Sequence, residues 1–260
     1  LRMINKRLLR NARLKHSQVG ENTLNSWSSN YALSIYPINS VYTFIPKNAC
    51  STLRFSIAIA NGFIRDIKDI GWIHNNNGTF RASQREASLA SFTFVVLRCP
   101  YTRIASCFLD KVVDEVISFN DEMGNKISLN FHEFLLQVQS QKQSEREQHW
   151  RNQSDFLHYE KYDEYFSLEL FSEAIVSLAA HGLKVHDTRE LIKHGISNLK
   201  AVDGDFSKMK AEQIKKMKEE GSAPNYKSMF SKVEIDLVNE IYNDDMNLYK
   251  SHFGESELLF

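Results

Sequence analysis

The segment FTFVVLRCPYTRIASCF, residues 92–108, indicates the fold class most clearly. It opens on an unbroken run of apolar and β-branched residues, which is typical of a strand buried on both faces of a parallel sheet. Pro100 ends this run, and Ile104, Cys107 and Phe108 then follow at the spacing of one helix face. The segment is therefore predicted to form a strand, a short loop and a helix.

A second strand–loop–helix unit lies earlier in the chain. Residues 41–45 read VYTFI, a β-branched and aromatic run that ends at Pro46. We expect Ser51 or Thr52 to cap the helix that follows, and Gly62 to end it. Residues 41–62 are therefore also predicted to form a strand, a tight loop and a helix.

The rest of the chain continues the alternation of strands and helices. A third strand is predicted at 162–166, and further helices are predicted at 131–143, 175–182, 209–220 and 231–253. This order favours an α/β fold with a central, mostly parallel sheet flanked by helices. We expect residues 1–40 to be a partly helical N-terminal extension and residues 41–260 to be a single domain.

The composition excludes several classes of protein. Lys and Arg number 32 and Asp and Glu number 32, so the formal charge is zero and a bulk binder of nucleic acid is not expected. With only 10 Gly and 4 Pro the sequence predicts long helices, and it contains neither GxxxxGK[ST] nor GxGxxG. No apolar run approaches the ~20 residues of a membrane span.

The three cysteines are Cys50, Cys99 and Cys107. An odd and sparse set is typical of a reducing compartment and is a poor disulfide framework. No two of them have CxxC spacing, and no metal site is predicted.

The loop after the first predicted strand has the features of an anion site. A helix N-terminus offers free backbone N–H groups and the positive end of the helix dipole. Lys47 adds a point charge, and Ser51 and Thr52 add hydroxyl groups. The alternative interpretation is an ordinary turn with a surface lysine and a capping hydroxyl.

The loop after the second predicted strand carries a second cation. Arg98 follows the buried strand directly, at the carboxyl edge of the sheet where open α/β proteins bind ligands. Its guanidinium can place two N–H groups on a phosphate, and Ser106 lies two helical turns further on. The alternative is an ion pair with a nearby carboxylate. Together the two loops describe a site for a ligand with two separate anionic groups.

Four motifs in the right order resemble those of the sulfotransferases, and specifically of the carbohydrate sulfotransferase branch. Residues 46–51, PKNACS, resemble the 5′-phosphosulfate loop of that family, and residues 96–111 resemble its 3′-phosphate segment. Residues 147–153, EQHWRNQ, resemble the HW segment that follows it. Residues 224–226 and 241–249 resemble the C-terminal Tyr and IYxxDxxLF patterns.

The resemblance covers roughly residues 41–250 and implies a P-loop-like fold, a donor and a reaction. The donor is 3′-phosphoadenosine 5′-phosphosulfate, the product is 3′,5′-adenosine bisphosphate, and no metal is implied. The reaction moves a sulfuryl group to a hydroxyl of a carbohydrate acceptor. The residues implied in donor binding are Lys47, Asn48, Ala49, Cys50, Ser51 and Thr52 for the 5′-phosphosulfate, and Arg98, Ser106 and the supporting Lys111 for the 3′-phosphate. Lys47 is also implied in stabilising the leaving phosphate oxygen.

The acceptor hydroxyl needs a general base, and His149 in the HW segment is the first candidate. The alternative for His149 is a residue that orders its loop beside Trp150. Glu145, Glu147 and His132 are the other candidates for the base.

The chain departs from the family pattern at three single positions, and residues 166–170 match the pattern poorly. Cys99 replaces an Asp, Asn152 replaces a Pro, and Ala49 replaces a Gly, so we expect the backbone at Ala49 to avoid positive φ.

Two rival functions stay open, a catalytically weak sulfotransferase-like binding module and a small-molecule kinase. Golgi members of the family carry an anchor and disulfides, so a bacterial-type cytoplasmic enzyme is expected, with a truncated Golgi-lumenal enzyme as the alternative. The acceptor's identity and the oligomeric state stay open.

Overall fold

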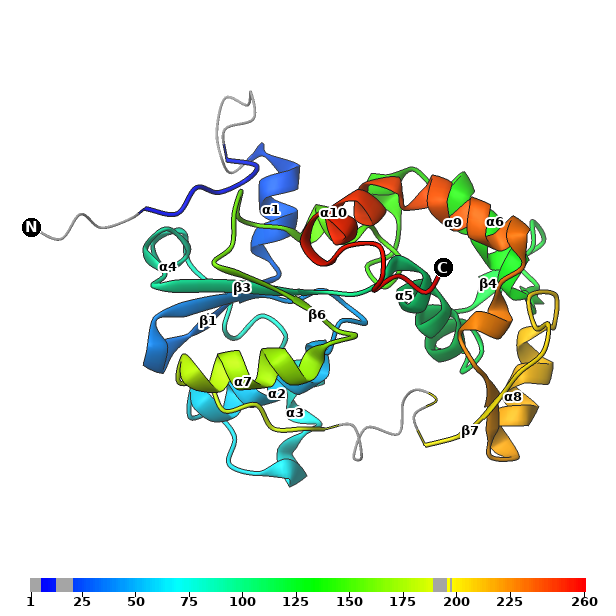
Figure 1. Ribbon diagram of the computed structural model, residues 1–260, viewed down its shortest axis with the longest axis horizontal. Helices are drawn as coiled ribbons and strands as arrows, with labels where there is room; N and C mark the ends of the chain where they lie inside the picture. The colour runs from blue at the N-terminus through cyan, green and yellow to red at the C-terminus, as the bar shows by residue number, and fades with distance from the viewer. Residues whose placement is uncertain (1–5, 13–20, 189–195, 197) are drawn as a thin grey trace, which may run out of the picture. The chain divides into compact units, whose positions relative to one another are not determined.

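A computed structural model describes residues 6–12, 21–188, 196 and 198–260 of the chain (Figure 1). The described residues form two compact units. Unit 1 draws on residues 1–97 and 153–188, and unit 2 draws on residues 98–152 and 189–260. The chain passes from one unit to the other directly after the strand that ends at Leu97.

Unit 1 is built on a four-stranded sheet of order β1-β2-β3-β6. Its strands are β1 (Ala32–Ile35), β2 (Ser40–Thr43), β3 (Phe92–Leu97) and β6 (Glu164–Ser167). β1 is antiparallel to β2, while β2, β3 and β6 run parallel, with Thr43 opposite Val95 and Val95 opposite Tyr165. The predicted α/β fold with a mostly parallel sheet is confirmed, and the carboxyl ends of three strands meet at one edge.

Helices cover both faces of this sheet (Figure 1). Figure 1 shows α2 and α7 on one side and α1 and α4 on the other. The helices of unit 1 are α1 (Thr23–Ser29), α2 (Cys50–Ala60), α3 (Trp72–Asn75), α4 (Gln84–Leu89) and α7 (Phe171–Ala180). The buried core includes Tyr42 and Phe94, whose stacked rings lie 5.0 Å apart between centroids.

Unit 2 is mainly helical and packs around aromatic side chains. Its α-helices are α5 (Pro100–Cys107), α6 (Phe131–Ser140), α8 (Ala211–Glu219), α9 (Lys232–Ile241) and α10 (Asn243–Phe253). Its short strands are β4 (Phe119–Asn120), β5 (Lys126–Ile127), β7 (Lys200–Val202) and β8 (Ser222–Pro224). Phe108, Phe131, Phe134 and Trp150 are buried together, with ring centroids 5.4 to 5.6 Å apart in neighbouring pairs.

Three local predictions are wrong. The final helix is not continuous over 231–253, because Tyr242 leaves the helical conformation and donates its hydroxyl to the Trp150 carbonyl at 2.6 Å. The third strand begins at Glu164 and not at Tyr162, whose buried hydroxyl instead donates a hydrogen bond to Thr43 Oγ1 at 2.8 Å. The helices are not long: the longest described α-helices span 11 residues. Scarce glycine did not lengthen them, because the few glycines stand where helices end: Gly62, Gly182, Gly221 and Gly254, each with positive φ, follow α2, α7, α8 and α10.

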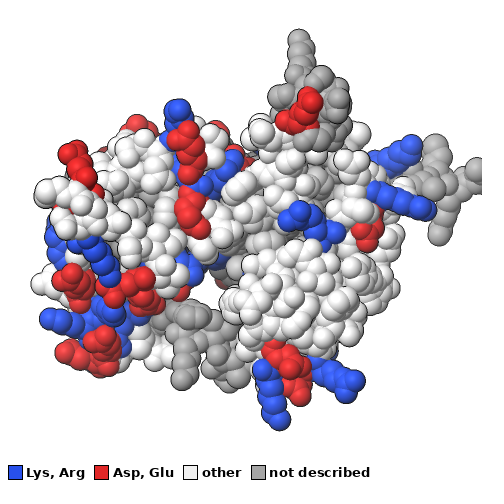
Figure 2. Space-filling model, turned by 180° about the vertical axis from the view of Figure 1, so that it is seen from behind, with Lys and Arg blue, Asp and Glu red and all other residues white. Residues whose placement is uncertain are grey.

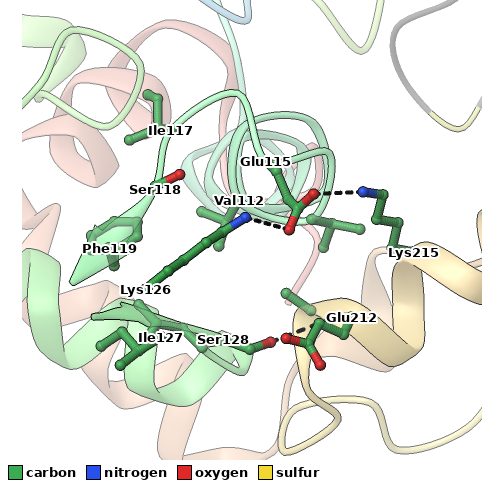
Figure 3. A pocket seen from close by; sticks show the side chains of 13 residues that line it. Val112, Glu115, Ile117, Ser118, Phe119, Lys126, Ile127, Ser128, Glu212 and Lys215 are labelled. Carbon is green, nitrogen blue, oxygen red and sulfur yellow. Dashed lines mark hydrogen bonds and ion pairs between the residues drawn. The ribbon is translucent and has the colours of Figure 1, made fainter. Parts of the chain in front are cut away.

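A small cavity in unit 2 shows how its outer elements are held together (Figure 3). Glu115 accepts hydrogen bonds from Lys126 of β5 at 2.5 Å and from Lys215 of α8 at 2.6 Å. These hydrogen bonds and charges lower the pKa of Glu115 to about 2. The cavity beside them holds about 20 Å³, room for one water, so it is a feature of packing.

Within the described ranges, no helix is both long enough and apolar enough to cross a membrane.

Candidate active site

The loop between β2 and α2 in unit 1 has an unusual backbone. After Pro46 the chain turns tightly, with the N–H of Asn48 donating to the carbonyl of Ile45 at 3.2 Å. Lys47 has φ 74° and Ala49 has φ 54°, so both residues are left-handed. The prediction that Ala49 avoids positive φ is therefore wrong. The turn and the helix that begins beside it impose this conformation although the residue is not glycine.

The left-handed residues have a cost and a structural consequence. A left-handed alanine costs roughly 1–2 kcal/mol relative to a relaxed one, and such strain gathers at functional sites. Turn residues of this kind direct successive backbone N–H groups to one side and form an anion-binding concavity. In this loop that concavity adjoins the N-terminus of an 11-residue helix, where the first N–H groups have no acceptor within the helix.

Asn48 fixes the loop to the sheet of unit 1. Its side chain is fully buried, and its Nδ2 donates to the Val96 carbonyl at 2.9 Å and to Gln153 Oε1 at 2.6 Å. Since the backbone N–H of Asn48 is already used in the turn, this residue holds the loop in shape. The structure thus gives Asn48 a role that the sequence did not reveal.

The beginning of α2 also differs from the prediction. Ala49 is the N-cap, and Ser51 and Thr52 lie inside the first turn, so neither of them caps the helix. The Thr52 hydroxyl is buried and lies 2.7 Å from the hydroxyl of Thr188. Ser51 and Cys50 are half-buried at the helix start, on the loop that carries Lys47.

Arg98 begins unit 2 directly after β3 and is almost fully buried. Its Nε donates to Thr102 Oγ1 at 3.1 Å, and that hydroxyl donates in turn to the carbonyl of Cys99, also at 3.1 Å. Its guanidinium carbon lies 5.4 Å from the centre of the Tyr226 ring. The guanidinium is therefore held both at one edge and over one face, a rigid arrangement for a cation that binds an anion.

Ser106 lies on α5 one helical turn beyond Thr102, so the two hydroxyls share a face of the helix. Arg98, Thr102 and Ser106 follow each other at four-residue intervals, and all three are buried. Arg98 thus lies just before the N-terminus of α5 and Ser106 lies in its last turn, with Thr102 between them in the chain and hydrogen-bonded to Arg98.

Lys111 lies in a π-helical turn, Phe108–Val112, that continues α5. Its Nζ is 3.2 Å from Asp110 Oδ2. π turns inside helices are rare and are frequent at functional sites. Lys111 also acts electrostatically on Glu147, whose pKa its charge lowers.

His149 is held by a carboxylate. Its Nδ1 lies 2.9 Å from both carboxylate oxygens of Glu147, and its backbone N–H donates to Glu147 Oε2 at 2.7 Å. Burial raises the pKa of Glu147, but the hydrogen bonds and charges of His149 and Lys111 outweigh it, so the pKa lies below its ordinary value. A carboxylate at Nδ1 leaves Nε2 as the ring nitrogen that can take a proton from a substrate.

The other two candidates for the base are engaged elsewhere. Glu145 is exposed and faces Lys142 at 3.5 Å. His132 Nδ1 lies 2.7 Å from Oε1 of Glu234, a fully buried carboxylate that also caps α9. His132 therefore contributes to a structural network within unit 2.

Sequence reasoning missed the residues that position this HW segment. Arg103 is buried and donates to the carbonyl of Arg151 at 2.8 Å, and Tyr242 donates to the carbonyl of Trp150. Both residues lie in motifs quoted from the sequence, but those motifs did not indicate a role for either residue. In the part of the chain that the structure describes, no three His, Cys, Asp or Glu side chains gather closely enough to hold a metal.

Comparison with known proteins adds an independent finding. A family model described as "Sulfotransferase family" matches residues 38–252. A search of curated proteins and a search of solved structures gave no significant match.

Proposed function

Because this chain belongs to the sulfotransferase family, we propose that it transfers a sulfuryl group from 3′-phosphoadenosine 5′-phosphosulfate to a hydroxyl of a carbohydrate. The observation that carries the donor assignment is the loop in which left-handed Lys47 and Ala49 precede α2. Such a concavity fits a tetrahedral anion, and no glycine-rich nucleotide loop competes with it in the sequence. The order of the four motifs supports the carbohydrate branch.

The two ends of the donor would be bound by different residues. We assign the 5′-phosphosulfate to the Lys47 side chain and to the N–H groups of Cys50, Ser51 and Thr52. We assign the 3′-phosphate, which carries about −1.5 to −2 charge, to Arg98 and Ser106, with Thr102 fixing the guanidinium. A buried arginine held in this way loses little freedom when it binds a phosphate.

The transfer step would use one base and one cation. The acceptor oxygen forms a bond to sulfur while the bond between sulfur and the 5′-phosphate oxygen breaks. The acceptor's proton passes to Nε2 of His149, whose imidazole Glu147 holds by Nδ1. The departing phosphate oxygen gains negative charge, and Lys47 stabilises it.

Thermal unfolding in the presence of nucleotides tests the proposal. We expect 3′,5′-adenosine bisphosphate to raise the Tm in the presence of EDTA, and ADP to raise it much less with or without magnesium. An equal response to both nucleotides, or a response to ADP that needs magnesium, would contradict the proposal and favour the kinase alternative. Binding of the bisphosphate without sulfated product on any saccharide acceptor would favour the binding-module alternative.

A further inference from the structure

The end of α2 opposite the Lys47 loop carries a cluster of aromatic side chains. Gly62 has φ 82°, and the N–H of Phe63 donates back to the carbonyl of Ala58 at 3.0 Å, which turns the chain outward. Phe63 is therefore 52% exposed. Its ring lies 4.9 Å from that of Phe80 and 5.9 Å from that of Trp72.

The rings of Phe63 and Trp72 border an open hollow of about 420 Å³ in unit 1. Phe63 and Trp72 line it together with Arg65, Lys68 and Asp69. Pockets for organic ligands usually combine aromatic walls with a few polar groups in this way. Figure 2 shows a broad area of the same unit without Lys, Arg, Asp or Glu, with charged side chains of both signs at its lower edge.

Two cations, Arg65 and Lys68, and one carboxylate, Asp69, line the hollow, and Asp66 lies beside it in the chain. The carboxylate of Asp69 accepts a hydrogen bond from the backbone N–H of Arg65 at 3.2 Å, and that of Asp66 accepts from the N–H of Lys68 at 2.8 Å. Neither Arg65 nor Lys68 forms an ion pair with any residue that the structure describes. Two cationic heads are therefore available next to two aromatic rings.

We propose that this hollow binds an anionic saccharide. The C–H face of a sugar ring would pack on Phe63 and Trp72, and a sulfate ester or carboxylate on the sugar would bind Arg65 and Lys68. A hydrocarbon ligand would leave the two cations without a role, and a small inorganic anion would leave the exposed rings without one. A sugar that carries an anionic group uses both.

The hollow is separate from the donor loop. α2 spans 11 residues between them, which is about 16 Å at 1.5 Å per residue. The hollow is therefore too far away to belong to the sulfuryl transfer step itself. The identification of its ligand with the acceptor or product chain rests on the proposed function, and it implies an oligosaccharide and not a single sugar.

Isothermal titration calorimetry with three hexasaccharides tests the proposal without any donor. The probes are a heparin hexasaccharide with sulfate and carboxylate, a hyaluronan hexasaccharide with carboxylate alone, and neutral maltohexaose. We expect one or both anionic probes to bind and maltohexaose to bind at least tenfold more weakly. Binding of heparin alone assigns sulfate as the recognised group, and binding of hyaluronan as well assigns any anion. Absence of binding by both anionic probes overturns the proposal.

Two sets of variants separate a built site from general attraction of anions to a basic surface. Arg65→Ala with Lys68→Ala should weaken binding of the anionic probe about tenfold. Arg85→Ala with Lys161→Ala removes two exposed cations elsewhere on unit 1 and should leave binding unchanged. Equal losses in the two double variants overturn the proposal.

Phe63 supplies the decisive comparison. Phe63→Ala should weaken binding about fivefold through loss of ring contact, and Phe63→Tyr, which keeps the ring, should restore it. If Phe63→Ala binds the anionic saccharide with unchanged affinity, the rings do not contribute to binding, and the proposal is overturned. The nucleotide measurements on the unaltered chain are independent, so donor binding without saccharide binding rejects this inference alone, and the reverse rejects the proposed function.

Discussion

The imidazole Nδ1 of His149 lies 2.9 Å from both carboxylate oxygens of Glu147, two residues before it in the chain. The same carboxylate accepts the backbone N–H of His149 at 2.7 Å. This short-range arrangement needs no distant element to orient the ring. His149 and Glu147, two candidates for the general base, are therefore hydrogen-bonded to each other. We propose His149 as the base and Glu147 as the residue that positions it.

Replacement of His149 by Gln should lower kcat by about 10²–10⁴-fold, because proton transfer from the acceptor would lose its base. Affinity for 3′,5′-adenosine bisphosphate should stay within twofold. The matched control is His132→Gln, which removes a histidine that also pairs with a glutamate but lies outside the proposed site. A fall in kcat that is as large for His132→Gln as for His149→Gln would contradict the assignment.

Glu147→Gln should lower kcat less than His149→Gln does, by about tenfold, because the amide positions the ring less well. Since Glu147 acts through His149, the double variant should be no slower than His149→Gln alone. Steady-state kinetics of the three variants measures this. Independent, multiplicative losses would show that Glu147 has a separate role in the reaction.

Ala49→Gly should stabilise the protein, by about 0.5–1 kcal/mol. Glycine at φ 54° removes the steric cost of a left-handed alanine, and this gain exceeds the added entropy of the unfolded chain. Ala179→Gly, at an exposed position of α7, should instead destabilise it by about 0.5–1 kcal/mol. Urea unfolding of both variants tests the opposite signs, and a loss of stability in both would mean that Ala49 is not left-handed.

Stability should fall in mild acid because of His158. This residue is buried and bound to Ser28 at 3.1 Å, and burial lowers its pKa to about 4. Between its ordinary pKa of about 6.5 and 4, the unfolded chain takes up a proton that the folded chain refuses, so unfolding becomes easier as the pH falls. From pH 7 to pH 5 the loss is about 2 kcal/mol.

The variant His158→Asn keeps a hydrogen-bonding group near Ser28 but cannot titrate. Its free energy of unfolding, measured by urea at pH 7 and pH 5, should fall by about 2 kcal/mol less than that of the unaltered chain. An equal pH dependence in both chains would show that His158 is protonated freely in the folded state.

The sequence predicted the sheet well where residues are buried on both faces. β3 was predicted at its observed bounds, because a run such as FTFVVL fits few other environments. β1 was missed, because four residues of mixed character carry little periodic signal and its register depends on pairing with β2. The break at Tyr242 was also hidden, since it depends on a carbonyl 92 residues away in the chain.

The same division applies to the proposed site. Lys47 and Arg98 were chosen from motif order and from their places after strands, and His149 from motif order alone, and their roles stay predictions. The left-handed Ala49, the anchor at Asn48 and the hydroxyl of Thr102 beside Arg98 were not predicted, because each depends on tertiary contacts that short-range patterns do not encode. Propensity alone favoured the wrong conformation at Ala49, where the turn and the helix start determine the backbone.

The most direct test of the central claim is the loss of binding affinity when the nucleotide lacks its 3′-phosphate. Calorimetry would compare 3′,5′-adenosine bisphosphate with adenosine 5′-monophosphate on the unaltered chain and on Arg98→Ala. If Arg98 binds the 3′-phosphate, the unaltered chain should prefer the bisphosphate by about 100-fold or more, and Arg98→Ala should lose most of that preference. Equal affinity of the unaltered chain for both nucleotides, or an unchanged preference in Arg98→Ala, would contradict the account.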